Sequence, residues 1–303
     1  MGMNWEGGKK SIFASYHPLM NFLYFGYVLL VPVFFLHPIF LGISLLSSIA
    51  YSIYLGRKKA LIFFLVFVLP VMLVAAIFNP MFNHHGATML FYVHYNPITL
   101  EAIIYGICNA AMLGSVILWF SCYNAIMTSD KFIYLFCRIV PAMSLIISMA
   151  LRLVPRYQAQ VAKINSARRG IGFDVSSGNY LQRVKSGGEV LSVMVTWALE
   201  NGIETGDSML ARGYGLPGRT AYSNYRFDTR DHMLLAALLA LICMVLTNII
   251  TGTVSVQYYV SFVLGDVWQV SWLAYICHAA VCLLPLGLEI REELLWQSLR
   301  SSI

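Results

Sequence analysis

The chain has 303 residues, of which 59% are hydrophobic and 11% are charged. A soluble globular domain carries about 25% charged residues, so this composition excludes one and predicts a polytopic membrane protein. The net charge of +6 does not indicate a nucleic-acid partner, because Lys and Arg in a membrane protein mainly mark loops that face the cytoplasm.

Four apolar runs in the first half of the chain approach the roughly 20 residues that cross a bilayer. They cover residues 19–36, 39–55, 61–78 and 98–125. Lys9, Lys10 and the basic run 57–59 alternate with a loop at 79–97 that has no Lys or Arg. The positive-inside rule therefore places the basic residues in the cytoplasm and this loop outside.

The segment 132–154 is apolar enough to span, but Arg138, Pro141 and Arg152 interrupt it. A crossing here would put the basic interval that follows on the outer side, against the charge rule. We therefore predict a helix pair that lies at the membrane interface or folds back into the bundle.

The interval 152–230 contains about half of the 20 Lys and Arg residues. Its pattern predicts an amphipathic helix that starts at Pro155 and ends near Arg169, a loop or short helix over 171–185, and a longer helix over 188–211. Residues 190–199 are apolar nearly all round, so we expect protein or lipid to bury them. Small residues recur at every fourth position and predict a close crossing with the first helix: Ala198, Gly202 and Gly206.

Two further apolar runs, 233–250 and 270–290, flank a second cation-free loop at 251–269, and a charged tail covers 291–303. The expected fold is an all-α polytopic membrane protein with about six transmembrane helices, both termini cytoplasmic, and a cytoplasmic coupling domain of long crossed helices. The expected domains are 1–127 and 231–303 in the membrane, with the coupling domain at 128–230.

An Arg-Gly pair occurs near both predicted helix ends, as Arg169-Gly170 and Arg212-Gly213. An Arg in the last turn meets the negative end of the helix dipole, and the following Gly supplies a left-handed cap. A single Arg-Gly helix end is common and does not indicate a function, whereas two of them in one polar interval indicate a shared role. A guanidinium at a helix tip also presents a planar donor fork to an acidic groove.

These runs resemble the signatures of a known family. Residues 208–215 (SMLARGYG), with Gly218-Arg219-Thr220, resemble the second Ala-Arg-Gly signature of the transmembrane T component of energy-coupling factor (ECF) transporters, and residues 151–170 resemble the segment of the first. The outer-loop run 79–86 is also similar to loops in that family. The likeness covers most of the chain and is strongest over 152–220. Arg168 stands where Ala is usual, and by register with Gly170 we choose Arg169 as the main contact.

The resemblance implies a non-catalytic subunit without a cofactor, in the plasma membrane. It implies two cytoplasmic ATPases of the ABC type that hydrolyse ATP, and an S component that binds a vitamin or metal ion. The T component links them through its two signature arginines. The implied ATPase-docking residues, followed by the supporting ones, are Arg169, Gly170, Ala211, Arg212 and Gly213, then Ala167, Arg168, Arg152 and Arg219.

Other chemistry fits the sequence less well. Gly8-Lys9 is followed by Lys10, so it is not a phosphate-binding loop, and the Gly-x-Gly-x-x-Gly pattern at 213–218 follows a helix and contains Pro217. The outer-loop histidines 84, 85 and 94 lack Cys or carboxylate neighbours, which favours solvent or interface positions over a metal site. Glu200, Glu204 and Asp207 are interpreted as solvated or paired charges.

The rival function is a stand-alone secondary transporter or channel. It would need charges or broken helices inside the membrane, and these are scarce in the predicted spans. An integral membrane enzyme would need a converging His, Asp or Ser cluster, and the sequence offers none.

Overall fold

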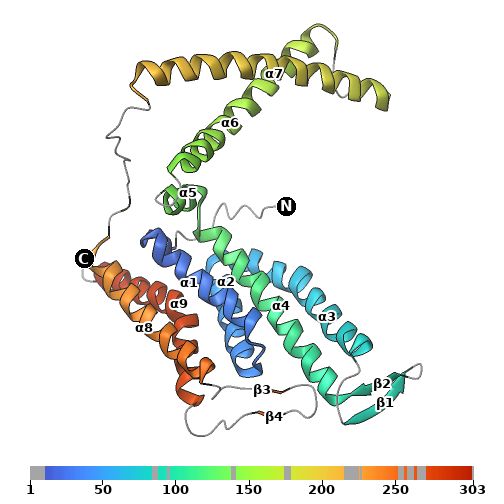
Figure 1. Ribbon diagram of the computed structural model, residues 1–303, viewed down its shortest axis with the longest axis vertical. Helices are drawn as coiled ribbons and strands as arrows, with labels where there is room; N and C mark the ends of the chain where they lie inside the picture. The colour runs from blue at the N-terminus through green and yellow to red at the C-terminus, as the bar shows by residue number, and fades with distance from the viewer. Residues whose placement is uncertain are drawn as a thin grey trace. The chain divides into compact units, whose positions relative to one another are not determined.

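The computed structural model describes residues 11–83, 88–93, 96–137, 141–173, 179–214, 225, 227–251, 256–257, 263–264 and 271–301. The described residues form mainly helices, which confirms the all-α prediction (Figure 1): α1 (Pro18–Phe34), α2 (Pro38–Phe63), α3 (Leu69–Phe82), α4 (Leu100–Ile126), α5 (Ser129–Cys137), α6 (Pro141–Gly170), α7 (Tyr180–Ala211), α8 (Thr229–Ile250) and α9 (Ser271–Ser301). A short turn, Phe13–Ser15, precedes α1, and a π-helical turn, Phe64–Val68, joins α2 to α3.

Each cation-free loop contains a short antiparallel hairpin. The first pairs β1 (Met89–Val93) with β2 (Asn96–Thr99), and the second pairs β3 (Val256–Gln257) with β4 (Val263–Leu264). A β-bulge interrupts the first ladder between Met89 and Phe91. The hairpins were not predicted, because the sequence analysis treated both segments as loops.

Contacts divide the chain into two units. The first unit comprises residues 1–131 and 225–303, and the second comprises residues 132–224. The predicted domain boundaries follow residues 127 and 230, whereas the division by contacts follows residues 131 and 224.

Four described stretches of the first unit are long and apolar enough to cross a membrane: Pro38–Phe82, Leu100–Ile126, Thr229–Ile250 and Trp272–Arg300. The 17-residue helix α1 is shorter. Pro38–Phe82 has 45 residues, about twice one crossing. It departs from helical geometry at Arg57, whose φ is +46°. A multi-pass membrane protein is thus confirmed, and the count of six crossings stays a prediction.

The core of the first unit is built from aromatic side chains around Trp119 of α4. Trp119 is fully buried, and its ring meets those of Tyr24 and Phe25 edge-on at centroid distances of 5.9 and 6.4 Å. Its indole N–H donates to the Ser44 hydroxyl at 3.0 Å. A buried indole needs such a partner, so this contact fixes α4 against α1 and α2.

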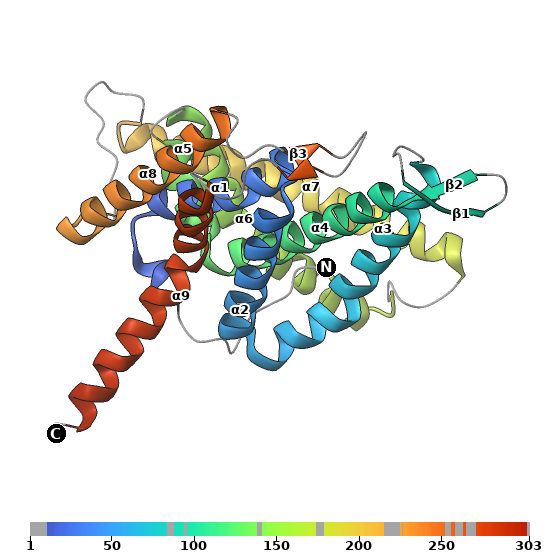
Figure 2. The ribbon, with the colours of Figure 1, turned by 90° about the horizontal axis from the view of Figure 1, so that it is seen from below.

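Buried polar side chains attach α9 to the N-terminal helices. Tyr27 of α1 contacts His278 Nδ1 at 2.9 Å, and the Tyr275 hydroxyl contacts His37 Nε2 at 3.1 Å. Farther along α9, the buried Glu289 carboxylate accepts hydrogen bonds from the Phe13 backbone N–H at 3.3 Å and from the Ser11 hydroxyl. Figure 2 shows α9 continuing beyond the helices it packs against.

Two boundaries in the second unit differ from the prediction. The predicted helix pair in 132–154 corresponds to α5 and the first half of α6, but no new helix starts at Pro155, because α6 is continuous across it. Proline removes one helical hydrogen bond, and the residue whose carbonyl loses its donor, Leu151, is exposed.

The helix predicted from residue 188 starts eight residues earlier, at Tyr180. Asn179 caps it, accepting from the Tyr180 N–H at 2.9 Å, while the Gln182 side chain accepts from the Asn179 N–H at 3.1 Å. This capping box offsets the cost of Gly187 and Gly188 inside the helix, about 1 kcal/mol each relative to Ala.

Lys131 connects the end of α4 to the N-terminal turn of the first unit. Its side chain is buried, and its ammonium donates to the carbonyl of Ile126, the last residue of α4, at 3.1 Å and also to the carbonyl of Ala14. The cation therefore lies at the negative end of the helix dipole. Burial lowers the pKa of Lys131 from 10.5 to about 8.

This pKa predicts a pH dependence of stability. Between pH 8 and 10.5 the unfolded chain binds more protons at Lys131 than the folded chain does, so the free energy of unfolding should rise with pH across this window. Lys131→Met should remove that rise, whereas the exposed Lys163→Met should keep it. Thermal unfolding in detergent at pH 7 to 10.5 checks this, and identical profiles for the two variants would contradict it.

Candidate functional site

The end of α6 has the hydrogen bonds of a Schellman cap. The Phe173 N–H donates to the Arg168 carbonyl at 2.9 Å, and the Gly172 N–H donates to the Arg169 carbonyl at 3.1 Å. Gly172 takes the left-handed conformation, with φ of +85°. The prediction that Gly170 caps this helix is therefore wrong, because Gly170 is the last helical residue and the cap is two residues later.

The end of α7 has the same cap. The Tyr214 N–H donates to the Met209 carbonyl at 3.0 Å, and the Gly213 N–H donates to the Leu210 carbonyl at 3.0 Å. Gly213 is left-handed, with φ of +75°, as predicted from the sequence. Arg212 directly precedes the left-handed glycine and is exposed.

The two Arg-Gly pairs thus occupy different positions relative to their caps. Arg169 lies three residues before its left-handed glycine, and Arg212 lies one residue before. An offset of two residues corresponds to about 200° around a helix of 3.6 residues per turn. Measured from the left-handed glycine of each cap, the two arginines therefore point in different directions. The sequence pattern Arg-Gly suggests that they are equivalent.

Arg168 and Arg169 differ in exposure. The Arg168 guanidinium donates to the Glu189 carboxylate of α7 at 2.7 Å, and the two side chains are 15% and 49% exposed. Arg168 thus joins α6 to α7 within the second unit. Arg169 is exposed, and the choice of Arg169 as the main contact stays a prediction.

Trp197 of α7 forms the centre of the contact between the two helices. The Arg156 guanidinium lies 5.7 Å from the Trp197 ring centroid, and the Tyr157 ring meets it edge-on at 5.5 Å and 74°. Val190 and Met194 are buried on the same helix. Figure 1 shows α7 crossing α6 in this region and continuing past it.

The predicted small-residue stripe is open in the structure. A Cβ added to Gly202 or Gly206 would meet no atom within 4 Å. The contacts of Glu189 and Trp197 with α6 lie nearer the start of α7 than the stripe does. Ala211 lies 14 residues beyond Trp197, about 21 Å along the helix axis. Gly202 and Gly206 therefore have open space around them, and the crossing assigned to Ala198, Gly202 and Gly206 stays a prediction.

Several apolar side chains of α7 are exposed in the described part of the chain. Leu191, Leu199 and Ile203 are 65%, 65% and 67% exposed, and Leu210 is 71% exposed. Glu200, Glu204 and Asp207 are also exposed, in agreement with their interpretation as surface charges.

The remaining predicted site residues are described only in part. Arg152, Ala167 and Ala211 are exposed. Arg219, the glycines at 215 and 218 and the histidines at 84, 85 and 94 lie outside the described residues. Within the described ranges, no three His, Cys, Asp or Glu side chains are grouped in a way that could hold a metal ion.

The sequence analysis missed Gly172, Glu189, Arg156, Tyr157 and Trp197. The repeated pattern Arg-Gly-x-Gly at 169–172 and 212–215 could have indicated that either glycine of each pair can end its helix. The contacts of Trp197 and Glu189 depend on the register between two helices, which local sequence does not reveal.

Comparison with known proteins supports the resemblance found in the sequence. No protein-family profile matches the chain. It is similar to the energy-coupling factor transporter transmembrane protein EcfT of Lactobacillus helveticus, with 33% identity over 108 residues, which are 35% of this chain and 39% of the relative. EcfT of Streptococcus thermophilus is 33% identical over 34% of this chain and 40% of the relative. EcfT of Bacillus subtilis is 31% identical over 34% of this chain and 39% of the relative.

The resemblance to the T component is therefore confirmed over about a third of the chain, and not over most of it as expected. The match likewise spans about two fifths of the length of these curated relatives.

The open stripe generates a test on stability. Gly202→Ala and Gly206→Ala should each stabilise α7 by about 1 kcal/mol, because Ala favours the helix and nothing obstructs its Cβ. Amide hydrogen exchange near each site should slow by up to about fivefold. Gly287→Ala, which is also open, should act only on α9. Faster exchange in α7 would contradict the open geometry.

Proposed function

We propose that this chain is the T component of an ECF-type ABC importer. It has no catalytic site and needs no cofactor. It couples ATP hydrolysis by two cytoplasmic ABC-type ATPases to the reorientation of a membrane-embedded S component that carries a vitamin or metal ion. The chain lies in the plasma membrane with both termini and the second unit in the cytoplasm.

The observation that carries this proposal is the pair of capped helix ends in one unit. Arg169 and Arg212 are both exposed, each close to a left-handed glycine, on helices that contact each other. Two such tips fit a partner that supplies two grooves, as a pair of ATPases does. The similarity to proteins named as ECF transporter transmembrane subunits supports the same assignment.

The coupling step follows from this arrangement. ATP binding closes the two ATPases, and the docked tips of α6 and α7 are drawn together. The helices act as levers on the membrane helices and on the docked S component, which turns and releases its substrate inside. The small residues Gly170, Ala211 and Gly213 keep the helix ends narrow, while Ala167, Arg168, Arg152 and Arg219 support the docking surface.

The exposed apolar face of α7 supports a further membrane partner. Leu191, Leu199 and Ile203 are about two-thirds exposed and would be covered by the S component or by lipid. The stripe of Ala198, Gly202 and Gly206, which is open at its two glycines, would let a helix of that partner approach closely.

Charge reversal at the tips tests the docking. Arg169→Glu combined with Arg212→Glu should weaken ATPase binding at least about thirtyfold, because an interfacial charge that loses its partner costs about 2–5 kcal/mol. Uptake in whole cells should fall with it. Arg183→Glu, an exposed residue near the start of α7, is the matched control and should bind normally. Normal uptake by the double variant would contradict the proposal.

Co-purification separates this function from a stand-alone transporter or channel. A T component should carry two ATPase subunits and a small hydrophobic protein through affinity purification of the tagged chain. A chain that purifies alone and transports in liposomes without ATPases would establish the rival function.

A further inference from the structure

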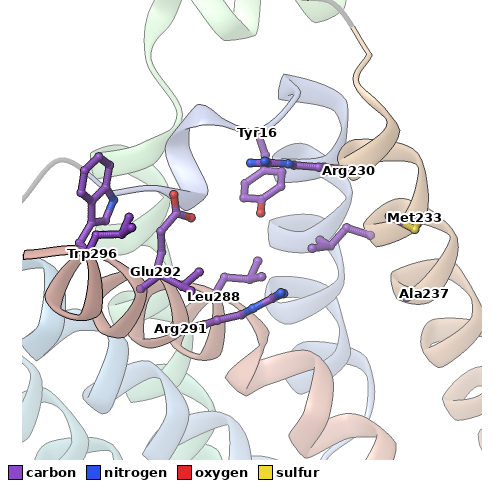
Figure 3. Close-up of a pocket in the computed structure, with 11 residues that line it drawn as sticks. Tyr16, Arg230, Met233, Ala237, Leu288, Arg291, Glu292 and Trp296 are labelled. Carbon is purple, nitrogen blue, oxygen red and sulfur yellow. The ribbon is translucent and has the colours of Figure 1, made fainter. Parts of the chain in front are cut away.

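A cavity of about 680 Å³ lies between α8 and α9 of the first unit, closed on one side by Tyr16. Its volume falls in the range of small-molecule sites, about 300–1,000 Å³. None of its lining residues belongs to the proposed docking tips. Figure 3 shows Arg291 reaching from α9 toward α8, with Arg230 and Tyr16 facing the same space.

The lining is divided by chemistry. Arg230 and Arg291 contribute positive charge, and Glu292 contributes one negative charge, so the charged residues that line the cavity are net positive. Asp231, which neighbours Arg230 in sequence, is buried, and its carboxylate accepts from the Asp228 N–H at 3.2 Å in the cap of α8. The polar part of the cavity is therefore suited to a single anionic group.

The rest of the lining is apolar and belongs to two candidate membrane spans. Met233, Leu234 and Ala237 follow Arg230 along α8, and Leu288 and Leu295 lie one turn on either side of the charged pair of α9. On α8 the apolar run begins directly after the charged residues. A ligand that occupies both parts must join an anionic group to a hydrocarbon chain.

Aromatic residues mark the depth of the cavity. Tyr16 lines it beside Arg230, whereas Trp296 lines it on the far side of Glu292 and is 60% exposed (Figure 3). Tyr and Trp gather at the level of the lipid head groups, and Arg near a helix end extends to the same level. This composition places the cavity at the membrane–water interface, where a phospholipid brings its phosphate beside its acyl chains.

We propose that this cavity binds a phospholipid with an anionic head group, with Arg230 and Arg291 holding the phosphate and the apolar residues of α8 and α9 holding an acyl chain. The site goes beyond the proposed function and does not depend on ATPases or an S component.

Native mass spectrometry of the full-length chain in detergent micelles tests the site, with phosphatidylglycerol and phosphatidylcholine as probes. Wild type should prefer phosphatidylglycerol. Arg230→Gln and Arg291→Gln should each weaken its binding about fivefold, whereas Arg291→Lys should retain most of it, because each basic residue near a membrane surface contributes about a factor of five. Arg300→Gln, an exposed arginine of α9 outside the cavity, should bind as wild type does.

A variant that binds the lipid more tightly shows that changes in this cavity do not act merely by misfolding the protein. Glu292→Gln removes the negative charge in the lining and should strengthen phosphatidylglycerol binding about fivefold. Ala237→Phe should weaken binding of both lipids by filling the apolar part. Inorganic phosphate and glycerol phosphate at millimolar concentration should displace nothing.

Four results would overturn the proposal. Equal binding of the two lipids would indicate a non-selective groove. An equal loss in Arg300→Gln would indicate general charge attraction. Displacement of phosphatidylglycerol by inorganic phosphate would indicate that the cavity binds a soluble phosphate compound. Unchanged phosphatidylglycerol binding by Glu292→Gln would indicate that the cavity receives a helix of a partner protein.

Discussion

The contact of Trp197 with Arg156 and Tyr157 is what makes α6 and α7 a pair. Because the latter two are consecutive, one side chain of α7 fixes both the position and the rotation of α6. A cation–π contact at an exposed site contributes about 0.5–1 kcal/mol, an aromatic pair about 0.5–1.5 kcal/mol, and a surface ion pair such as Arg168–Glu189 up to about 1 kcal/mol. These contacts contribute a few kcal/mol in addition to the burial of Val190 and Met194 on α7.

The first unit is constrained differently. Its core encloses Trp119 among aromatic rings, and its helices are also joined by polar contacts that reach across the sequence, from Tyr27 to His278 and from Phe13 to Glu289. A Trp N–H and a buried carboxylate both need fixed partners, which limits how these helices can move past one another. In the proposed T component, this firmly packed unit would receive the movement that the α6–α7 pair transmits.

The sequence predicted the elements whose signals are local. Apolar runs found the membrane helices, and Gly213 was found as a left-handed cap because it directly follows the last helical residues. The prediction that Gly170 caps α6 was wrong because Gly172, two residues later, takes the left-handed conformation instead. Both residues are glycine, so propensity does not show which of them ends the helix. The start of α7 was missed because Gly187 and Gly188 outweighed the Asn179–Gln182 capping box. Contacts such as Trp197 with Arg156 depend on helix register, which has no local signal.

The distances from the Trp197 contact to the two tips have a mechanical consequence. From Tyr157, which meets Trp197, α6 continues for 13 residues, and from Trp197 α7 continues for 14. The two arms are therefore of almost equal length, and a displacement of the same size at either tip turns its helix through nearly the same angle about this contact. A pair of subunits that closed symmetrically on the tips would thus meet balanced levers.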